Sequence, residues 1–180
     1  MIISNQLYSE TNQNSFEVAY LAGGCYWGLE DLIMEIPGVE QTKVGFSGGH
    51  IKNVSYKEVT RGDTGHAESI EIKFQSKELS YEDLLFNFFR MHNPTTLNQQ
   101  GNDKGTQYRS SIFYTNDEQK NIAQHVINIV NESKKWDDPV LTEIIAFTNF
   151  YPAEETHQKY ISKNPDGYSC HFVRNFDFTK

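Results

Sequence analysis

The segment at residues 23–28, Gly-Gly-Cys-Tyr-Trp-Gly, constrains this chain more than any other feature. It follows an apolar run at 16–22 that is typical of a buried strand. It precedes four apolar residues spaced as one face of a helix, which Pro37 and Gly38 close. Cys25 therefore stands where a strand passes into the first turn of a helix. Unpaired backbone N–H groups and the helix dipole stabilise a thiolate there, so we expect a lowered thiol pKa.

Two aromatic residues, Tyr26 and Trp27, stand directly beside the sulfur and predict an apolar pocket around it. The flanking glycines allow backbone and substrate to approach closely. A single cysteine near a strand end is also typical of a small buried hydrophobic side chain. The choice between the two interpretations depends on the rest of the chain.

Composition excludes several classes of protein. With 180 residues, 37% hydrophobic and 13% aromatic, the chain fits one globular domain with a sizeable core. A formal net charge of −8 argues against nucleic acid or an anionic membrane as partner. No apolar run approaches the ~20 residues of a membrane span, and the start resembles no signal peptide. Two cysteines without a disulfide framework predict a cytoplasmic location.

Periodicity and capping predict the remaining elements. Strands are expected at 39–46, 70–74, 111–114 and 143–147, with a helical turn at 56–59. Ser80 with Asp83 predicts the start of a helix that runs to about Met91, and Asn116 caps a later helix. The order of strands and helices predicts an α+β fold, a two-layer sandwich built on a ferredoxin-like plait.

We expect a single domain over residues 1–180. Residues 1–14 are polar and predict a loosely held arm. Two stretches, 92–109 and 148–180, are expected to be irregular, the second forming a C-terminal tail. Structureless segments of this length inside a compact domain are usually functional.

Four motifs occur in order along the chain: Gly-Cys-Tyr-Trp-Gly at 24–28, Gly-Asp-Thr-Gly-His-Ala-Glu at 62–68, Gly-Asn-Asp-Lys-Gly-Thr-Gln-Tyr-Arg-Ser at 101–110 and Asn-Pro-Asp-Gly-Tyr at 164–168. Together they closely resemble the A-type peptide methionine sulfoxide reductases, enzymes that reduce the S-epimer of methionine sulfoxide. The resemblance covers residues 16–174 and implies no cofactor and no metal.

The resemblance implies a role for each matching residue. Cys25 corresponds to the nucleophile that attacks the sulfoxide sulfur. Glu68 corresponds to the acid that protonates the oxygen, for which partial burial must keep its proton in place near neutral pH. The other matching positions are two tyrosines that hydrogen-bond the oxygen, a pocket carboxylate and the aromatic pair around the S-methyl group: Tyr56, Tyr108, Asp103, Tyr26 and Trp27.

Each of these residues has an ordinary structural alternative. Glu68 opens an alternating strand, where its carboxylate could simply be solvated. Tyr56 and Tyr108 could be ordinary half-buried tyrosines. Asp103 in Gly-Asn-Asp-Lys-Gly is also typical of a turn residue. His66 suggests a cysteine–histidine hydrolase as an alternative interpretation, although the resemblance implies a mainly structural role for this residue. The other five histidines show no metal spacing.

Cys170 corresponds to the family's resolving cysteine. Attack on the sulfoxide leaves a sulfenic acid on Cys25, which a second thiol converts to a disulfide. A mobile tail would bring Cys170 to the site, and thioredoxin would then reduce the disulfide. The alternatives are a permanent Cys25–Cys170 bridge or an inert exposed thiol.

Two departures from the family pattern stand out. Tyr26 replaces the phenylalanine of many relatives, and the chain lacks a second C-terminal cysteine. We therefore expect a single resolving step in a monomer that acts on oxidised methionine in proteins and on free methionine sulfoxide. A different thiol enzyme, such as a peroxidase, and a non-catalytic module that binds oxidised methionine remain alternatives.

Overall fold

The computed structural model describes residues 15–179, so the predicted arm at 1–14 lies outside the described residues. The main helices and strands agree closely with those that periodicity and capping predict. In chain order the elements are β1 (Phe16–Gly23), α1 (Tyr26–Met34), β2 (Val39–Ser47), α2 (Tyr56–Val59), β3 (Ala67–Gln75), α3 (Tyr81–Met91), β4 (Gln99–Gln100), β5 (Asp103–Lys104), η1 (Thr106–Tyr108), β6 (Ser110–Tyr114), α4 (Asp117–Glu132), β7 (Glu143–Ala146), β8 (Phe150–Pro152), η2 (Glu155–His157) and α5 (Tyr160–Lys163).

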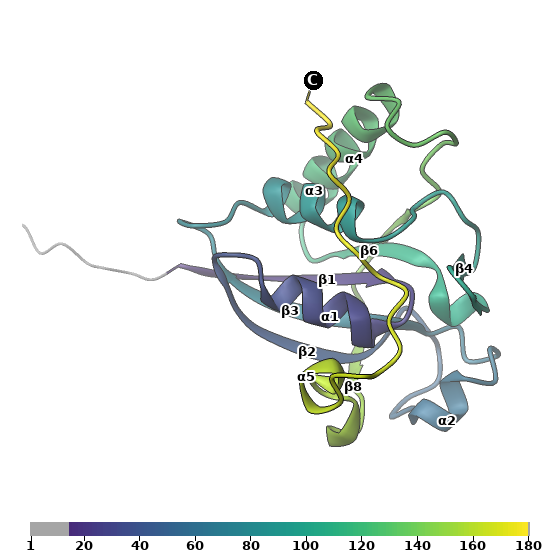
Figure 1. Ribbon diagram of the computed structural model, residues 1–180. Helices are drawn as coiled ribbons and strands as arrows, with labels where there is room; N and C mark the ends of the chain where they lie inside the picture. Colours follow the sequence, from purple (N-terminus) through teal and green to yellow (C-terminus); the bar gives the residue numbers. More distant parts are fainter. Residues whose placement is uncertain (1–14, 180) are drawn as a thin grey trace, which may run out of the picture.

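A six-stranded sheet in the order β7-β6-β1-β3-β2-β8 forms the centre of this mixed α+β fold. All neighbouring strands are antiparallel except the parallel pair β6–β7. Helices α1 and α3 lie together beside the sheet, and α4 packs on α3 (Figure 1). None of the helices in the described part of the chain is long and apolar enough to cross a membrane.

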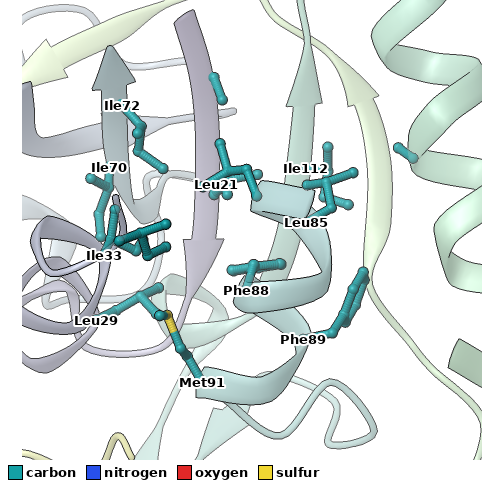
Figure 2. Packing of buried hydrophobic residues seen from close by; sticks show 14 of the residues in the cluster. Leu21, Leu29, Ile33, Ile70, Ile72, Leu85, Phe88, Phe89, Met91 and Ile112 are labelled. Carbon is teal, nitrogen blue, oxygen red and sulfur yellow. The ribbon is translucent and has the colours of Figure 1, made fainter. Parts of the chain in front are cut away.

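The core lies between the sheet and helices α1 and α3 (Figure 2). Alternate residues of the strands and one face of each helix meet there, as their periods of 2 and 3.6 require. The buried side chains include Leu21, Leu29, Ile33, Ile70, Ile72, Leu85, Phe88, Phe89 and Ile112.

The predicted helix caps are confirmed. Ser80 Oγ accepts a hydrogen bond from the backbone N–H of Asp83 at 3.0 Å, and Asn116 Oδ1 accepts one from Gln119 at 2.8 Å. Each cap satisfies one of the backbone donors that the first turn of a helix leaves unpaired.

The stretches expected to be irregular contain short elements that the sequence did not reveal. Strands β4 and β5 form a small hairpin, and β8 extends the main sheet by pairing with β2. Strands of two or three residues are too short to show a period of 2, so they form only because a partner lies beside them.

Long-range hydrogen bonds hold the segment between β8 and α5. The Gln158 side chain accepts from Val44 N–H and donates to Val44 C=O, both at 2.8 Å, as a neighbouring strand would. The backbone N–H of Lys159 donates to the buried Glu30 carboxylate at 2.8 Å, which also accepts from Thr42 Oγ1. This segment, which carries His157, is therefore fixed against β2 and α1.

The C-terminal segment after α5 runs past the end of α1 and then along α3 (Figure 1). The backbone N–H of Arg174 donates to Arg90 C=O at 3.0 Å, and Arg90 Nε donates to Phe176 C=O at 2.6 Å. Phe178 is buried beside Phe86. The segment contains no strand or helix within residues 164–179, yet it is anchored beyond Cys170.

Candidate active site

Cys25 is the N-cap residue of α1, at the joint between β1 and the helix, as the sequence predicts. Gly24 before it has φ +96°, a conformation that favours glycine. A Cβ on Gly24 would lie 2.5 Å from the Gln100 side chain, and one on Gly28 2.2 Å from Ser169 Oγ. Because these two positions lack a side chain, Gln100 and Ser169 can pack against the start of α1.

The expected fall in the pKa of Cys25 is not what the structure supports. Burial raises the pKa of this thiol well above its ordinary value, and the carboxylate of Glu68 raises it further. A backbone hydrogen bond from Trp27, at the helix start, acts in the opposite direction but is weaker. Cys25 is 7% exposed, so the loss of hydration outweighs the helix terminus and the resting group is a thiol.

Glu68 lies on β3, opposite Phe46 of β2, and is almost completely buried. One carboxyl oxygen accepts a hydrogen bond from the backbone N–H of Tyr26 at 3.1 Å. Burial raises the pKa of Glu68 to about 8, because an ionised carboxylate would lose its hydration there. The solvated-surface alternative is therefore excluded, and Glu68 carries a proton at neutral pH.

Three further predicted residues converge on Cys25 and Glu68. Tyr56 opens α2, Tyr108 ends η1, and Asp103 lies on β5. Burial and then the charge of Glu68 raise the pKa of Tyr56 to about 12. The same two causes raise the pKa of Tyr108, and Asp103 and Cys25 contribute to both shifts. Both phenols thus keep their protons and can donate hydrogen bonds.

The aromatic pair that follows Cys25 is held by a residue that the sequence did not single out. Trp27 Nε1 donates to Nδ1 of His157 at 3.1 Å, and the Tyr26 hydroxyl lies 3.1 Å from the same nitrogen. An indole N–H can only donate, so Nδ1 is the unprotonated nitrogen of His157. Trp27 also stacks on Tyr160, with ring centroids 3.8 Å apart. The Tyr26 hydroxyl is therefore paired with His157, so it is not left as an unpaired polar group beside the predicted apolar pocket.

The His66 side chain forms hydrogen bonds with backbone groups of a neighbouring segment. Nε2 lies 2.8 Å from the carbonyl of Ile51, and Nδ1 accepts from Gly49 N–H at 3.2 Å. Because both ring nitrogens are engaged, His66 is not placed to act as a base on Cys25.

The second cysteine lies near the first. Cys170 is half-buried, its sulfur is 3.6 Å from Asp103 Oδ2, and it contributes electrostatically to the pKa of Cys25. Both cysteines are free thiols in this structure, so Cys25 and Cys170 do not form a permanent disulfide. The structure thus gathers two thiols, a protonated carboxyl and two phenols at one end of the sheet, which defines a thiol-dependent oxidoreductase site.

Residues 17–180 match the protein family described as peptide methionine sulfoxide reductase. The chain is 51% identical over 160 residues to peptide methionine sulfoxide reductase MsrA 1 of Mesorhizobium japonicum, covering 89% of this chain and 91% of the relative. It aligns with the solved reduced form of Mxr1 from Saccharomyces cerevisiae at a TM-score of 0.84 and 37% identity, covering 91% and 95% of the two chains. A structure of Mxr1 in complex with Trx2 aligns at a TM-score of 0.61 and 22% identity, covering 91% and 94%. This chain belongs to the peptide methionine sulfoxide reductase family.

Removing the acceptor on His157 should loosen Trp27. In His157→Leu the indole N–H loses its partner, so we expect the fluorescence anisotropy of Trp27 to fall. Trp27 and Trp136 are the two tryptophans of the chain, and a Trp136→Phe background isolates the signal. His157→Asn, which places an amide oxygen near the position of Nδ1, is the control and should preserve the anisotropy. An unchanged value in His157→Leu would mean that stacking on Tyr160 alone holds the indole.

Proposed function

We propose that this chain reduces the S-epimer of methionine sulfoxide, in proteins and as the free amino acid, to methionine. The observation that carries the proposal is the pairing of the buried thiol of Cys25 with Glu68, a carboxyl that keeps its proton up to about pH 8. A sulfoxide oxygen leaves sulfur readily only when it is protonated, so the reaction needs an acid and a soft nucleophile side by side.

In the proposed reaction the Cys25 sulfur attacks the sulfoxide sulfur while Glu68 protonates the oxygen. Tyr56 and Tyr108, whose raised pKa values keep their hydroxyls protonated, donate hydrogen bonds to that oxygen. Asp103 lines the same pocket. The sulfur–sulfur bond made by the attack and the substrate's sulfur–oxygen bond then break as the oxygen passes to the Cys25 sulfur, which leaves methionine and a Cys25 sulfenic acid.

The state of Glu68 also governs the nucleophile. An ionised Glu68 raises the pKa of Cys25, and this part of the increase is absent while Glu68 holds its proton. As Glu68 gives its proton to the substrate oxygen, its carboxylate can take the proton of the Cys25 thiol, so little net charge builds up beside these buried side chains. The Trp27 backbone N–H favours the sulfur anion that forms during this exchange.

We assign the substrate's S-methyl group to the faces of Tyr26 and Trp27, which His157 and Tyr160 hold in place. With the methyl group there, the oxygen toward Glu68 and the sulfur above Cys25, one handedness of sulfoxide satisfies all three contacts. This geometry is the basis for selecting the S-epimer.

Cys170 is proposed as the resolving thiol, and a thioredoxin as the reductant of the resulting Cys25–Cys170 disulfide. Its nearness to the site and its position on an exposed segment support the first role. The complex of the related Mxr1 with Trx2 supports the second. Of the alternatives, a hydrolase has no use for a second thiol beside the site, and a non-catalytic module has no need for a protonated Glu68.

We also propose that the chain is a single domain built on a ferredoxin-like plait. The order β6-β1-β3-β2, antiparallel throughout, supports it, together with α1 after β1 and α3 after β3. A monomer and a cytoplasmic location stay predictions from the sequence.

The wild-type protein, reduced and freed of external thiols, should convert a peptide carrying methionine S-sulfoxide to the methionine peptide, seen as the loss of one oxygen by mass spectrometry. The R-epimer should remain oxidised. Cys25→Ser should form no product even in a first turnover, because an alcohol is a much poorer nucleophile toward sulfur. Equal conversion of both epimers would contradict the proposed pocket, and product from Cys25→Ser would contradict the nucleophile.

Glu68→Gln keeps the shape and the Tyr26 contact but cannot give up a proton. We expect the single-turnover rate to fall by roughly 10²–10⁴. The wild-type rate should decline as pH rises through about 8, because the folded pKa of Glu68 is raised and its acid form is populated below that value. This decline should be absent from the residual rate of Glu68→Gln, measured by rapid quench across pH 6–10. A mutant rate close to wild type would return Glu68 to a structural role.

Cys170→Ser should still complete a first turnover but lose steady-state activity with thioredoxin and its reductase. Excess substrate without reductant should take the wild type from two titratable thiols to none. The variant should instead hold a sulfenic acid on Cys25, which dimedone traps. If the wild type kept one free thiol after turnover, Cys170 would not be the resolving residue.

A further inference from the structure

His171 directly follows Cys170 and touches its sulfur. The Cys170 sulfur lies 3.6 Å from Nδ1 of His171 and 3.6 Å from Oδ2 of Asp103, within reach of an S–H hydrogen bond in each case. His171 is 8% exposed, while its neighbours Phe172 and Val173 are 58% and 55% exposed. One residue of this exposed segment is thus turned inward, and it is the one beside the thiol.

The hydrogen bonds of His171 determine which of its nitrogens carries the proton. Nε2 lies 2.7 Å from the backbone carbonyl of Gly23, which can only accept, so Nε2 is protonated. Burial lowers the pKa of His171, so the ring is neutral at pH 7. In the neutral ring Nδ1 then has a free lone pair, and it faces the Cys170 sulfur.

The same ring joins the two cysteine-bearing segments. Gly23 ends β1 two residues before Cys25, so the Gly23–His171 hydrogen bond ties Cys170 to the strand that carries the nucleophile. A Cβ on Gly28 of α1 would lie 3.1 Å from His171 Nδ1, which places the ring against the first turn of that helix. His171 therefore holds the segment that carries Cys170 beside the start of α1, where Cys25 lies.

The Cys170 thiol needs help to ionise. Burial and the charge of Asp103 raise the pKa of Cys170 to about 11, so it is almost entirely protonated near neutral pH. Attack on a sulfenic acid requires the thiolate. Asp103 also accepts from this thiol, but its negative charge opposes the thiolate, whereas it raises the pKa of His171 and so favours an imidazolium.

We propose that His171 is the general base of the resolving step, taking the Cys170 proton on Nδ1 while Nε2 stays bonded to Gly23. The freed electron pair on the Cys170 sulfur forms the bond to the Cys25 sulfur. The sulfur–oxygen bond of the sulfenic acid breaks, and the oxygen takes a proton from solvent and leaves as water. His171 then releases its proton to solvent, so the Cys170 sulfur is oxidised and the Cys25 sulfur reduced. This inference rests on the proposed function.

Four groups around the ring influence its protonation. Asp103 favours the imidazolium, and Arg174, on the same segment, disfavours it. The Cys170 thiol faces Nδ1, and His92 at the end of α3 lies close enough for the two rings to interact electrostatically. His92 is fully buried with a pKa lowered to about 3, so it stays neutral over the pH range of the test.

The test separates the base from the anchor with two variants of the full chain. His171→Gln can keep an N–H donor toward Gly23 but has no basic nitrogen beside Cys170, whereas His171→Ala lacks both. Enzyme with one equivalent of methionine S-sulfoxide peptide and no reductant is sampled for methionine, dimedone-reactive sulfenic acid and free thiols. In both variants we expect sulfenic acid to accumulate on Cys25 and disulfide formation to slow by roughly 10²-fold at pH 7.

The pH profile and chemical rescue identify a base. In His171→Gln the rate of disulfide formation should rise about tenfold per pH unit above pH 7, so a deficit of roughly 10²-fold closes near pH 9, still below the thiol pKa of about 11. Added imidazole should accelerate His171→Ala. Val173→Ala, an exposed neighbour that does not touch Cys170, is the matched control and should resolve at the wild-type rate, and thermal unfolding checks that all variants are folded.

The outcomes distinguish the inference from the function on which it depends. No methionine from the wild type would refute the reductase, and a free Cys170 thiol after wild-type turnover would refute the resolving role. Wild-type resolving by His171→Gln would overturn the base role. Slow resolving with a wild-type pH profile and no rescue by imidazole would overturn it as well, since His171 would then act only as an anchor.

Discussion

The hydrogen bond from the Tyr26 backbone N–H to the Glu68 carboxyl is the contact on which the site depends. It joins the start of α1, where Cys25 is the N-cap, to β3, which carries the acid, and both reacting side chains are buried. Because the carboxyl is buried, the proton stays on Glu68 up to about pH 8, and the neutral acid does not oppose ionisation of the thiol beside it. Burial raises the pKa of both groups: it keeps Cys25 a thiol, and it keeps on Glu68 the proton that the substrate oxygen needs.

The surroundings of this contact are supplied by segments that lie late in the chain. The segment between β8 and α5 brings His157 to the aromatic pair, and Gln158 and Lys159 fix it to β2 and α1. The C-terminal segment brings His171 against Gly28 of α1 and Cys170 against Gly101. Two stretches with little regular structure thus complete a site whose chemistry starts from β1, α1 and β3.

The resting tail differs from the mobile carrier expected for a resolving cysteine. Backbone hydrogen bonds to Arg90 and the buried Phe178 anchor it beyond Cys170, and His171 anchors it beside Cys170. Formation of a disulfide with Cys25 would therefore start from an anchored tail, and the exposed side chains of Tyr168, Phe172 and Val173 leave the stretch around Cys170 accessible from outside.

The sequence by itself predicted the longer elements and the residues that we propose to react. Helix faces, strand alternation and the Ser80 and Asn116 caps are local signals, and the structure confirms them because neighbours in sequence decide them. Only the tertiary structure decided the protonation states: the helix terminus suggested a thiolate at Cys25, but burial, which depends on residues far along the chain, makes it a thiol. His157 and His171 were missed for the same reason, since their partners lie 130 and 148 residues away and no periodicity reports such contacts.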